Sequence, residues 1–239
     1  MADFDPTHIA RARRPEKAGK ALWKQPTTFR LKAPPASVEF SPVAPHDFAA
    51  ASSLQVDIFS TESNAVYRTL SRFKDTVRCA SYRHDGRMLA AADERGNTQL
   101  FDVGARTVMR TFGGHSKAVH VARFAAEGGR LFTASDDTTA ICWDVTAEAQ
   151  LCTLTGHKDF VRSGALSPAS PHLFATGSYD HAVKLWDVRA NRCVMTLKHV
   201  APVEDVLPLP GGGMLASASG NTLTVSTHTH THATLSILF

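Results

Sequence analysis

The chain has 239 residues, of which 43% are apolar and 20% charged, and its net charge is +4. This length and apolar content suffice for one domain with a sizeable core. The start has no apolar run of signal-peptide or transmembrane length, and the cysteines have no paired spacing. We therefore expect an intracellular protein with reduced thiols. The cysteines are Cys79, Cys142, Cys152 and Cys193.

Residues 1–33 form a basic N-terminal arm. Residues 1–32 carry a net charge of +5, so the remainder of the chain carries −1. Such an arm can screen the phosphates of RNA or DNA, and it can equally be a solvated tail. Both interpretations stay open, because no platform of aromatic residues accompanies the charges. The residues that we assign to possible direct RNA contact are Arg11, Arg13, Arg14, Lys17 and Lys20.

From residue 34 onward, the sequence is organised in units of about 42 residues. The first unit spans 34–70, where short apolar and alternating runs predict strands at 38–42, 47–51 and 54–59. The second unit spans 71–112. These two units are weak copies of a pattern that becomes clear further along the chain.

The third unit (113–154) and the fourth (155–197) both begin with Gly-His and end with Trp-Asp. Their histidines are 42 residues apart and their tryptophans 43. A Gly-His to Trp-Asp unit of this length resembles a blade of a WD40 β-propeller, a four-stranded antiparallel sheet. The resemblance implies an all-β fold with about five blades, an incomplete version of the seven-bladed type.

In WD40 blades, a histidine, a serine or threonine, an aspartate and a tryptophan join in one buried chain of hydrogen bonds. The resemblance implies two such structural tetrads. Serine, histidine and aspartate also form the catalytic triad of hydrolases, but the periodic repetition already explains these residues as architecture. In the second unit Phe73 replaces the histidine and Arg95 the aspartate, so we expect packing to hold that blade. The tetrads are His115, Ser135, Asp137 and Trp143, and His157, Ser178, Asp180 and Trp186.

The fifth unit (198–225) is partial. Two strands are expected at 202–208 and 211–218, but no Trp-Asp pair follows, and residues 226–239 form a divergent tail rich in threonine and histidine. Alternating histidines could bind a metal ion, but a tail that arises from an altered reading frame or alternative splicing is the favoured interpretation. No metal or cofactor site is assigned. An incomplete ring leaves an open sheet edge, so we expect the isolated chain to be marginally stable or oligomeric.

A second periodic feature points to a partner surface. The innermost strand of each later blade begins with a valine, and these valines repeat every 42 residues while the next residue varies. In propellers this next residue lies near the rim of the central channel, so the sequence predicts a polar, mostly basic ring. Ordinary surface charge is the alternative. The predicted partner surface consists of Arg78, His120, Arg162, Tyr179 and Glu204.

Particular strings go beyond the generic repeat, among them 71–76, 114–120, 159–164, 174–181 and 202–207. They resemble the U three small nucleolar RNA-associated protein fifteen family, and the likeness covers roughly residues 22–225. The chain departs from that family by lacking its later blades and its helical C-terminal domain.

This resemblance implies a nuclear, nucleolar and non-catalytic scaffold of the small-subunit processome. Its partners would be other processome subunits and the precursor of small-subunit ribosomal RNA. Members of the family are also linked to ribosomal DNA transcription. The alternative is a WD40 substrate receptor of a ubiquitin ligase, which would recruit a short peptide to the predicted partner surface. In neither case is the chain expected to be an enzyme.

Overall fold

The computed structural model describes residues 28–227 and 235–238. The chain divides into two units, Met1–Arg30 and Leu31–Phe239, and the second contains all the described strands. Within the described residues every regular element is a strand, so no helix long and apolar enough to span a membrane occurs there. The prediction of an all-β propeller fold is confirmed.

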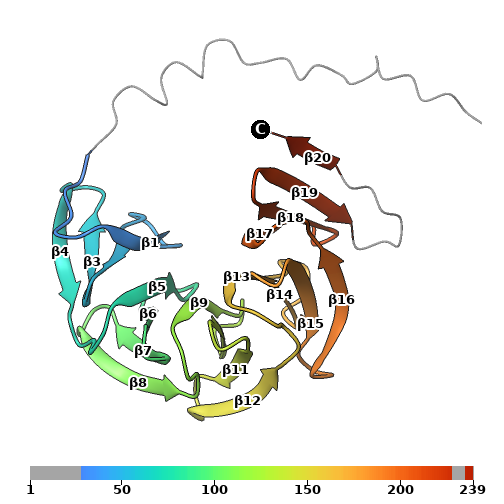
Figure 1. Cartoon of the computed structure of the whole chain (residues 1–239). Helices are drawn as coiled ribbons and strands as arrows, with labels where there is room; N and C mark the ends of the chain where they lie inside the picture. The colour runs from blue at the N-terminus through green and yellow to red at the C-terminus, as the bar shows by residue number, and fades with distance from the viewer. Residues whose placement is uncertain (1–27, 228–234, 239) are drawn as a thin grey trace, which may run out of the picture. The chain divides into compact units, whose positions relative to one another are not determined.

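The strands form five antiparallel sheets of four strands each, which follow one another along the chain (Figure 1). Each sheet is a meander in which consecutive strands pair. The first sheet contains β1 (Pro35–Phe40), β2 (Phe48–Ser52), β3 (Gln55–Ser60) and β4 (Ala65–Leu70). The second contains β5 (Val77–Tyr82), β6 (Met88–Asp93), β7 (Asn97–Asp102) and β8 (Thr107–Gly113). The third contains β9 (Val119–Phe124), β10 (Arg130–Ser135), β11 (Ala140–Asp144) and β12 (Ala149–Leu154). The fourth contains β13 (Val161–Leu166), β14 (Leu173–Ser178), β15 (Ala182–Asp187) and β16 (Arg192–Lys198). The fifth contains β17 (Val203–Pro208), β18 (Met214–Ser219), β19 (Thr222–Thr227) and β20 (Leu235–Leu238).

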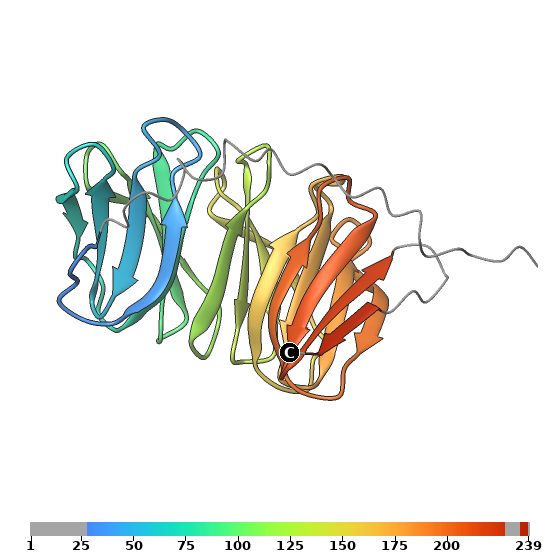
Figure 2. The same cartoon turned by 90° about the horizontal axis from the view of Figure 1, so that it is seen from above.

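The first strand of each sheet lies innermost and contacts the first strand of the next sheet, so β1, β5, β9, β13 and β17 follow one another. Figure 1 shows these strands on the inner side and β4, β8, β12 and β16 on the outer side. Figure 2 shows the sheets side by side in chain order, from the first in blue to the last in red. The second strands of the first four sheets are rich in alanine and other small residues and are mostly buried. Small side chains suit a strand that is covered on both faces by neighbouring sheets.

Apolar cores fill the interfaces between consecutive sheets. Three large clusters join the first sheet to the second, the second to the third and the third to the fourth. Each contains at least one fully buried aromatic or large aliphatic side chain, such as Phe101, Leu131 or Phe174. Among the residues whose side chains the structure describes, the cluster between the fourth and fifth sheets has five buried members. Within that part of the chain, the last interface is therefore the least extensively packed of the four.

Gly177 shows how closely the fourth and fifth sheets approach. A Cβ atom at this position would lie 2.3 Å from Ser163 Oγ, 2.6 Å from Val203 Cγ1 and 2.7 Å from Val206 Cγ2. All three distances are far below van der Waals contact. The second strand of the fourth sheet therefore needs glycine here to let β17 pack against it.

The fifth sheet differs from the prediction in one respect. The sequence predicted a partial unit that ends near residue 225, followed by a divergent tail. In the structure β19 extends to Thr227, and Leu235–Leu238 pairs with it as an antiparallel fourth strand. The free edge of β19 offers backbone donors and acceptors, and a short apolar segment satisfies them. Residues 228–234, which hold the three alternating histidines of the tail, lie outside the described residues.

Candidate partner-binding surface

A β-bulge near the start of each innermost strand creates the predicted partner surface. In β5 the pairing with β6 passes from Val77 directly to Cys79, so Arg78 has no residue opposite it. The same skip leaves His120, Arg162 and Glu204 without an opposite residue. A bulge inserts one extra residue and re-aims its side chain. The variable position of the repeat is therefore the position that the bulge turns away from the ladder.

Asp136 connects two of these bulge residues. Its Oδ1 and Oδ2 atoms accept hydrogen bonds from Arg162 Nε and Nη2, both at 3.0 Å. Its Oδ2 atom also lies 3.2 Å from His120 Nε2. Asp136 is buried, so this forked carboxylate–guanidinium pair lies partly out of water and is well oriented. The third and fourth sheets are thereby joined at the rim.

The guanidinium of Arg162 is also stacked against aromatic rings. Its central carbon lies 4.8 Å from the centre of the Tyr179 ring and 5.2 Å from that of Phe160. Tyr179 in turn donates a hydrogen bond from its hydroxyl group to Glu204 Oε2, at 3.3 Å. Residues from the third, fourth and fifth sheets thus form one continuous network. Arginine held in this way loses little side-chain entropy when a partner binds.

The pKa values follow from these contacts. The hydrogen bond to Asp136 raises the pKa of Arg162 further above its ordinary value. Burial lowers the pKa of His120, and its proximity to Asp136 only partly opposes this effect. Burial works to raise the pKa of Asp136, but the hydrogen bond from Arg162 and the contact with His120 outweigh it and the pKa is lowered. At neutral pH His120 is therefore an uncharged hydrogen-bonding group, while Arg162 and Asp136 are an ion pair.

Arg78 lies in the second sheet and forms an ion pair with Glu94. The prediction of a mostly basic ring is therefore wrong. Each arginine at a bulge has an acidic partner from a neighbouring turn, Glu94 for Arg78 and Asp136 for Arg162, and Glu204 adds a further carboxylate. The surface is one of balanced, oriented charges with the partly buried rings of Tyr179 and Phe160 beside them.

Sequence reasoning missed Glu94, Asp136 and Phe160. A signal for the first two was present, because Glu94, Asp136 and Tyr179 occupy the same position of the repeat at intervals of 42 and 43 residues. Tyr179 was assigned to the rim because of its position in the repeat. The same argument, applied to Glu94 and Asp136, would have placed them at the rim too.

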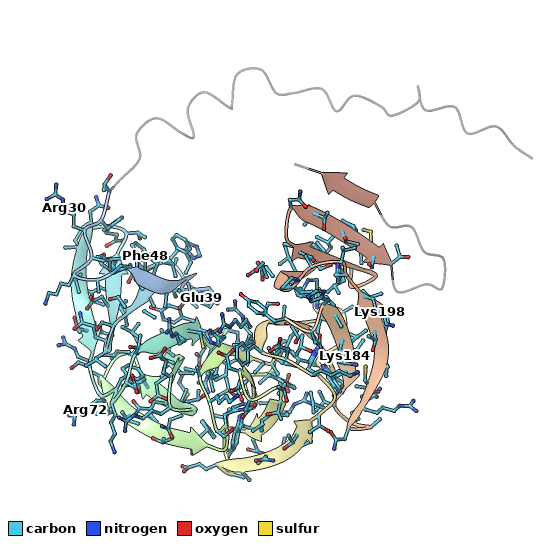
Figure 3. All side chains as sticks on the ribbon, viewed as in Figure 1. Arg30, Glu39, Phe48, Arg72, Lys184 and Lys198 are labelled. Atoms are coloured by element: carbon cyan, nitrogen blue, oxygen red, sulfur yellow. The ribbon has the colours of Figure 1, made fainter. Side chains whose placement is uncertain are left out.

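A further ion pair lies near the C-terminal ends of two innermost strands. There, Glu39 Oε2 accepts a hydrogen bond from Arg123 Nη1 at 2.8 Å. Glu39 belongs to β1 (Figure 3) and Arg123 to β9, so this pair joins the first sheet to the third. Both residues line a pocket of about 120 Å³, to which His120, Arg162 and Asp205 also contribute. The bulge residues His120 and Arg162 therefore belong both to the network at the rim and to this pocket.

The structural tetrads are built with a different hydroxyl group from the one predicted. In the fourth sheet, Trp186 Nε1 donates to Thr176 Oγ1 at 2.8 Å, and Thr176 Oγ1 lies 2.7 Å from His157 Nε2. His157 Nδ1 lies 2.9 Å from Asp180 Oδ2. The third sheet repeats this geometry with Thr133 as the bridging residue. Its contacts are Trp143 Nε1 to Thr133 Oγ1 at 2.9 Å, Thr133 Oγ1 to His115 Nε2 at 2.8 Å, and His115 Nδ1 to Asp137 Oδ2 at 2.9 Å.

Assigning Ser135 and Ser178 to the link between histidine and tryptophan was therefore a mistake. Ser178 Oγ donates to the carbonyl of Asp159 at 3.0 Å and accepts the backbone N–H of Asp180 at 3.0 Å. Ser135 does the same with the Lys117 carbonyl and the Asp137 N–H. The serines shape the turn that presents the aspartate, and the threonines two residues earlier complete the chain.

The electrostatics of the tetrads match a structural role. Burial lowers the pKa of His157, so its imidazole is neutral and can donate to Asp180 while it accepts from Thr176. Burial works to raise the pKa of Asp180, but hydrogen bonds from the Lys158 N–H and from His157 outweigh it, and the pKa is lowered. In the second sheet Phe73 packs on Phe101 at a centroid distance of 5.2 Å.

Two predicted features cannot be placed. Residues 1–27 of the basic arm, which include Arg11, Arg13, Arg14, Lys17 and Lys20, and the three alternating histidines of the tail lie outside the described residues. Across residues 28–227 and 235–238, no group of three or more His, Cys, Asp or Glu side chains is arranged to hold a metal ion. All four cysteines are free, with Cys79 and Cys142 buried.

Comparison with known proteins agrees with the fold. The family model "WD domain, G-beta repeat" matches residues 106–144 and 148–187, which cover most of the third and fourth units. The U3 small nucleolar RNA-associated protein 15 homolog of Bos taurus is 57% identical over 198 residues, which are 83% of this chain and 38% of that protein. The human homolog is 53% identical over the same shares of both chains.

The Saccharomyces cerevisiae U3 small nucleolar RNA-associated protein 15 is 39% identical over 207 residues, which are 83% of this chain and 40% of that protein. The chain therefore spans about two fifths of the length of these relatives. Similarity of this extent in vertebrates and in yeast, together with the WD40 repeats, shows that the chain belongs to the WD40-repeat U3 small nucleolar RNA-associated protein 15 family.

Proposed function

We propose that this chain is a non-catalytic scaffold subunit of the small-subunit processome in the nucleolus, where it supports ribosome biogenesis. The observation that carries the proposal is the 57% identity, over 83% of the chain, to a relative whose name associates it with U3 small nucleolar RNA. Because the chain covers 38% of that relative, the proposal concerns the repeat region.

The surface geometry supports a scaffold role. The network of His120, Asp136, Arg162, Tyr179 and Glu204 presents arginine and tyrosine groups in fixed orientations. Such groups are frequent anchors of protein–protein interfaces, and pre-organisation lowers the entropic cost of binding. Other processome subunits are the proposed partners at this surface.

The finer parts of the proposal concern nucleic acid. The scaffold would support processing of the precursor of 18S ribosomal RNA and transcription of ribosomal DNA. The basic arm would provide any direct RNA contact, because its lysine and arginine side chains can neutralise phosphates. The charge balance of the rim favours protein partners there, since Arg78 and Arg162 are already paired with carboxylates.

Affinity purification of the tagged chain from nuclear extract tests the proposal. The co-purifying U3 RNA and precursor ribosomal RNA are quantified by reverse transcription, and the proteins by mass spectrometry. We expect both RNAs and other processome subunits to be enriched over a tag-only control. Recovery of chaperones alone would refute the proposal. Recovery of ubiquitin-ligase subunits without precursor RNA would instead favour a substrate-receptor function.

A matched pair of variants tests the role of the rim. Arg162→Ala removes the stacked and forked arginine, whereas Arg189→Ala removes an arginine whose ion pair with Asp187 lies on the exposed surface. A central arginine of an interface contributes about 2 kcal/mol to the binding free energy. Recovery of processome proteins should therefore fall at least about tenfold for Arg162→Ala and stay unchanged for Arg189→Ala. An equal effect of both variants would exclude the rim as the partner site.

A further inference from the structure

Two cysteines lie directly opposite each other on neighbouring strands of the third sheet. Cys142 on β11 and Cys152 on β12 are partners in the antiparallel ladder. Opposite residues of such a ladder have Cα atoms about 4.5 or 5.5 Å apart, and their side chains point to the same face. Both values fall within the range of about 4.4–6.8 Å that a disulfide bond requires. The backbone therefore permits a bond between these residues without a change of fold.

The two thiols differ in their access to solvent. Cys142 is fully buried in the cluster that joins the third and fourth sheets, whereas Cys152 is partly exposed on the outermost strand. A small oxidant dissolved in water can thus reach Cys152 directly, whereas Cys142 is shielded from it. The pair has the arrangement of an exposed reacting thiol beside a sheltered resolving thiol.

The pKa values of the two thiols also differ, and they too favour Cys152 as the reacting thiol. The neighbouring Cys142 thiol lowers the pKa of Cys152, and the backbone N–H of Cys142 and Arg130 act in the same direction, which outweighs the effect of burial. The neighbouring Cys152 thiol and burial both raise the pKa of Cys142. A larger fraction of Cys152 is therefore thiolate at neutral pH, and the thiolate is the nucleophilic form.

We propose that Cys142 and Cys152 are a peroxide-sensitive dithiol, in which Cys152 reacts first and Cys142 then closes a disulfide bond between β11 and β12. The thiolate of Cys152 attacks one oxygen of hydrogen peroxide, forming an S–O bond while the O–O bond breaks. Hydroxide leaves and takes up a proton to give water. The Cys142 sulfur then attacks the sulfenic sulfur, the S–O bond breaks, and a second water leaves with the Cys142 proton. Two thiols are oxidised and one peroxide is reduced.

Peptide mapping of the full chain tests this step. The reduced protein is treated with hydrogen peroxide, the remaining thiols are blocked with N-ethylmaleimide, and the digest is analysed by mass spectrometry without reduction. We expect a linked peptide pair that contains Cys142 and Cys152, with Cys79 and Cys193 alkylated. A chain in which all four thiols remain alkylated, or in which Cys193 is oxidised first, would overturn the proposal.

Three variants separate the roles. In Cys142→Ser, Cys152 should stop at the sulfenic acid, which dimedone traps. In Cys152→Ser, oxidation at Cys142 should fall at least tenfold. Cys193→Ser is the matched control, because Cys193 packs on the same cluster but donates to the carbonyl of Met195 at 3.1 Å, and the disulfide should form at an unchanged rate. Loss of the linked pair in this control would refute the assignment.

The pH dependence of the rate of peroxide consumption is a further test, and it uses the unmutated chain, so no variant has to fold. Peroxide consumption by the intact chain should depend on pH with a midpoint below the value of about 8.5 of an ordinary cysteine. A midpoint at or above that value would show that the Cys152 thiolate is not stabilised, and would contradict the proposed order of reaction.

Discussion

Replacement of Thr176 by valine tests the corrected tetrad. The side chain keeps its shape but loses the hydroxyl group that accepts from Trp186 Nε1 and donates to His157 Nε2. Trp186 Nε1 and His157 Nε2 are then left buried without a hydrogen-bond partner. Each stranded group costs roughly 1–3 kcal/mol, so the free energy of unfolding should fall by about 2–6 kcal/mol. This is a large share of the roughly 5–15 kcal/mol by which a domain is stable.

Urea unfolding followed by tryptophan fluorescence measures this loss. Thr196→Val is the control, because Thr196 is exposed on β16 and its loss should change stability by less than about 0.5 kcal/mol. If Thr176→Val were as stable as the wild type, the threonine would not be the bridge that the hydrogen bonds indicate. An equal loss in both variants would mean that valine is generally unfavourable in this sheet.

Three further predictions follow from the geometry. The free energy of unfolding should fall as the pH drops below about 6.5. Burial lowers the pKa of His120 and His157 in the folded chain, so the unfolded chain binds protons first as the pH falls. A higher urea midpoint at pH 5.5 than at pH 7.5 would contradict this. Gly177→Ala should cost about 1–3 kcal/mol through overpacking against Ser163, Val203 and Val206, while Gly213→Ala, with no atom within 4 Å of its Cβ, should be nearly neutral in the same urea titration. Asp136→Asn should lower the pKa of His120 further, since the nearby carboxylate opposes the effect of burial; an NMR titration of the imidazole that showed an unchanged or higher pKa would disprove the coupling.

The repeat was enough to predict the sheets, because Gly-His and Trp-Asp recur at fixed intervals and each interval holds one four-stranded meander. It could not identify the bridging hydroxyl. Thr133 and Ser135 lie two residues apart on β10, as Thr176 and Ser178 do on β14, so both members of each pair face the same side of their strand. Both also recur with the period of the repeat. Only distances decide between them.

The charge of the rim was misjudged for a related reason. Counting the bulge residues alone gives two arginines, but the acidic residues that pair with them come from turns of the same and of a neighbouring sheet. The pairing depends on how the sheets are juxtaposed, which a single unit of the repeat does not contain.

The fourth strand of the fifth sheet was missed because Leu235–Leu238 carries no feature of the repeat and pairs through its backbone.

The uneven cores between the sheets predict an order of opening for the molecule. As far as side chains are described, the cluster between the fourth and fifth sheets contains five buried residues, whereas those of the other interfaces contain more than twice as many. Local opening costs least where few apolar contacts must be broken. Backbone amides of β17–β19 should therefore exchange with deuterium faster than those of β9–β11, so that the last blade separates from the array while the central blades remain folded.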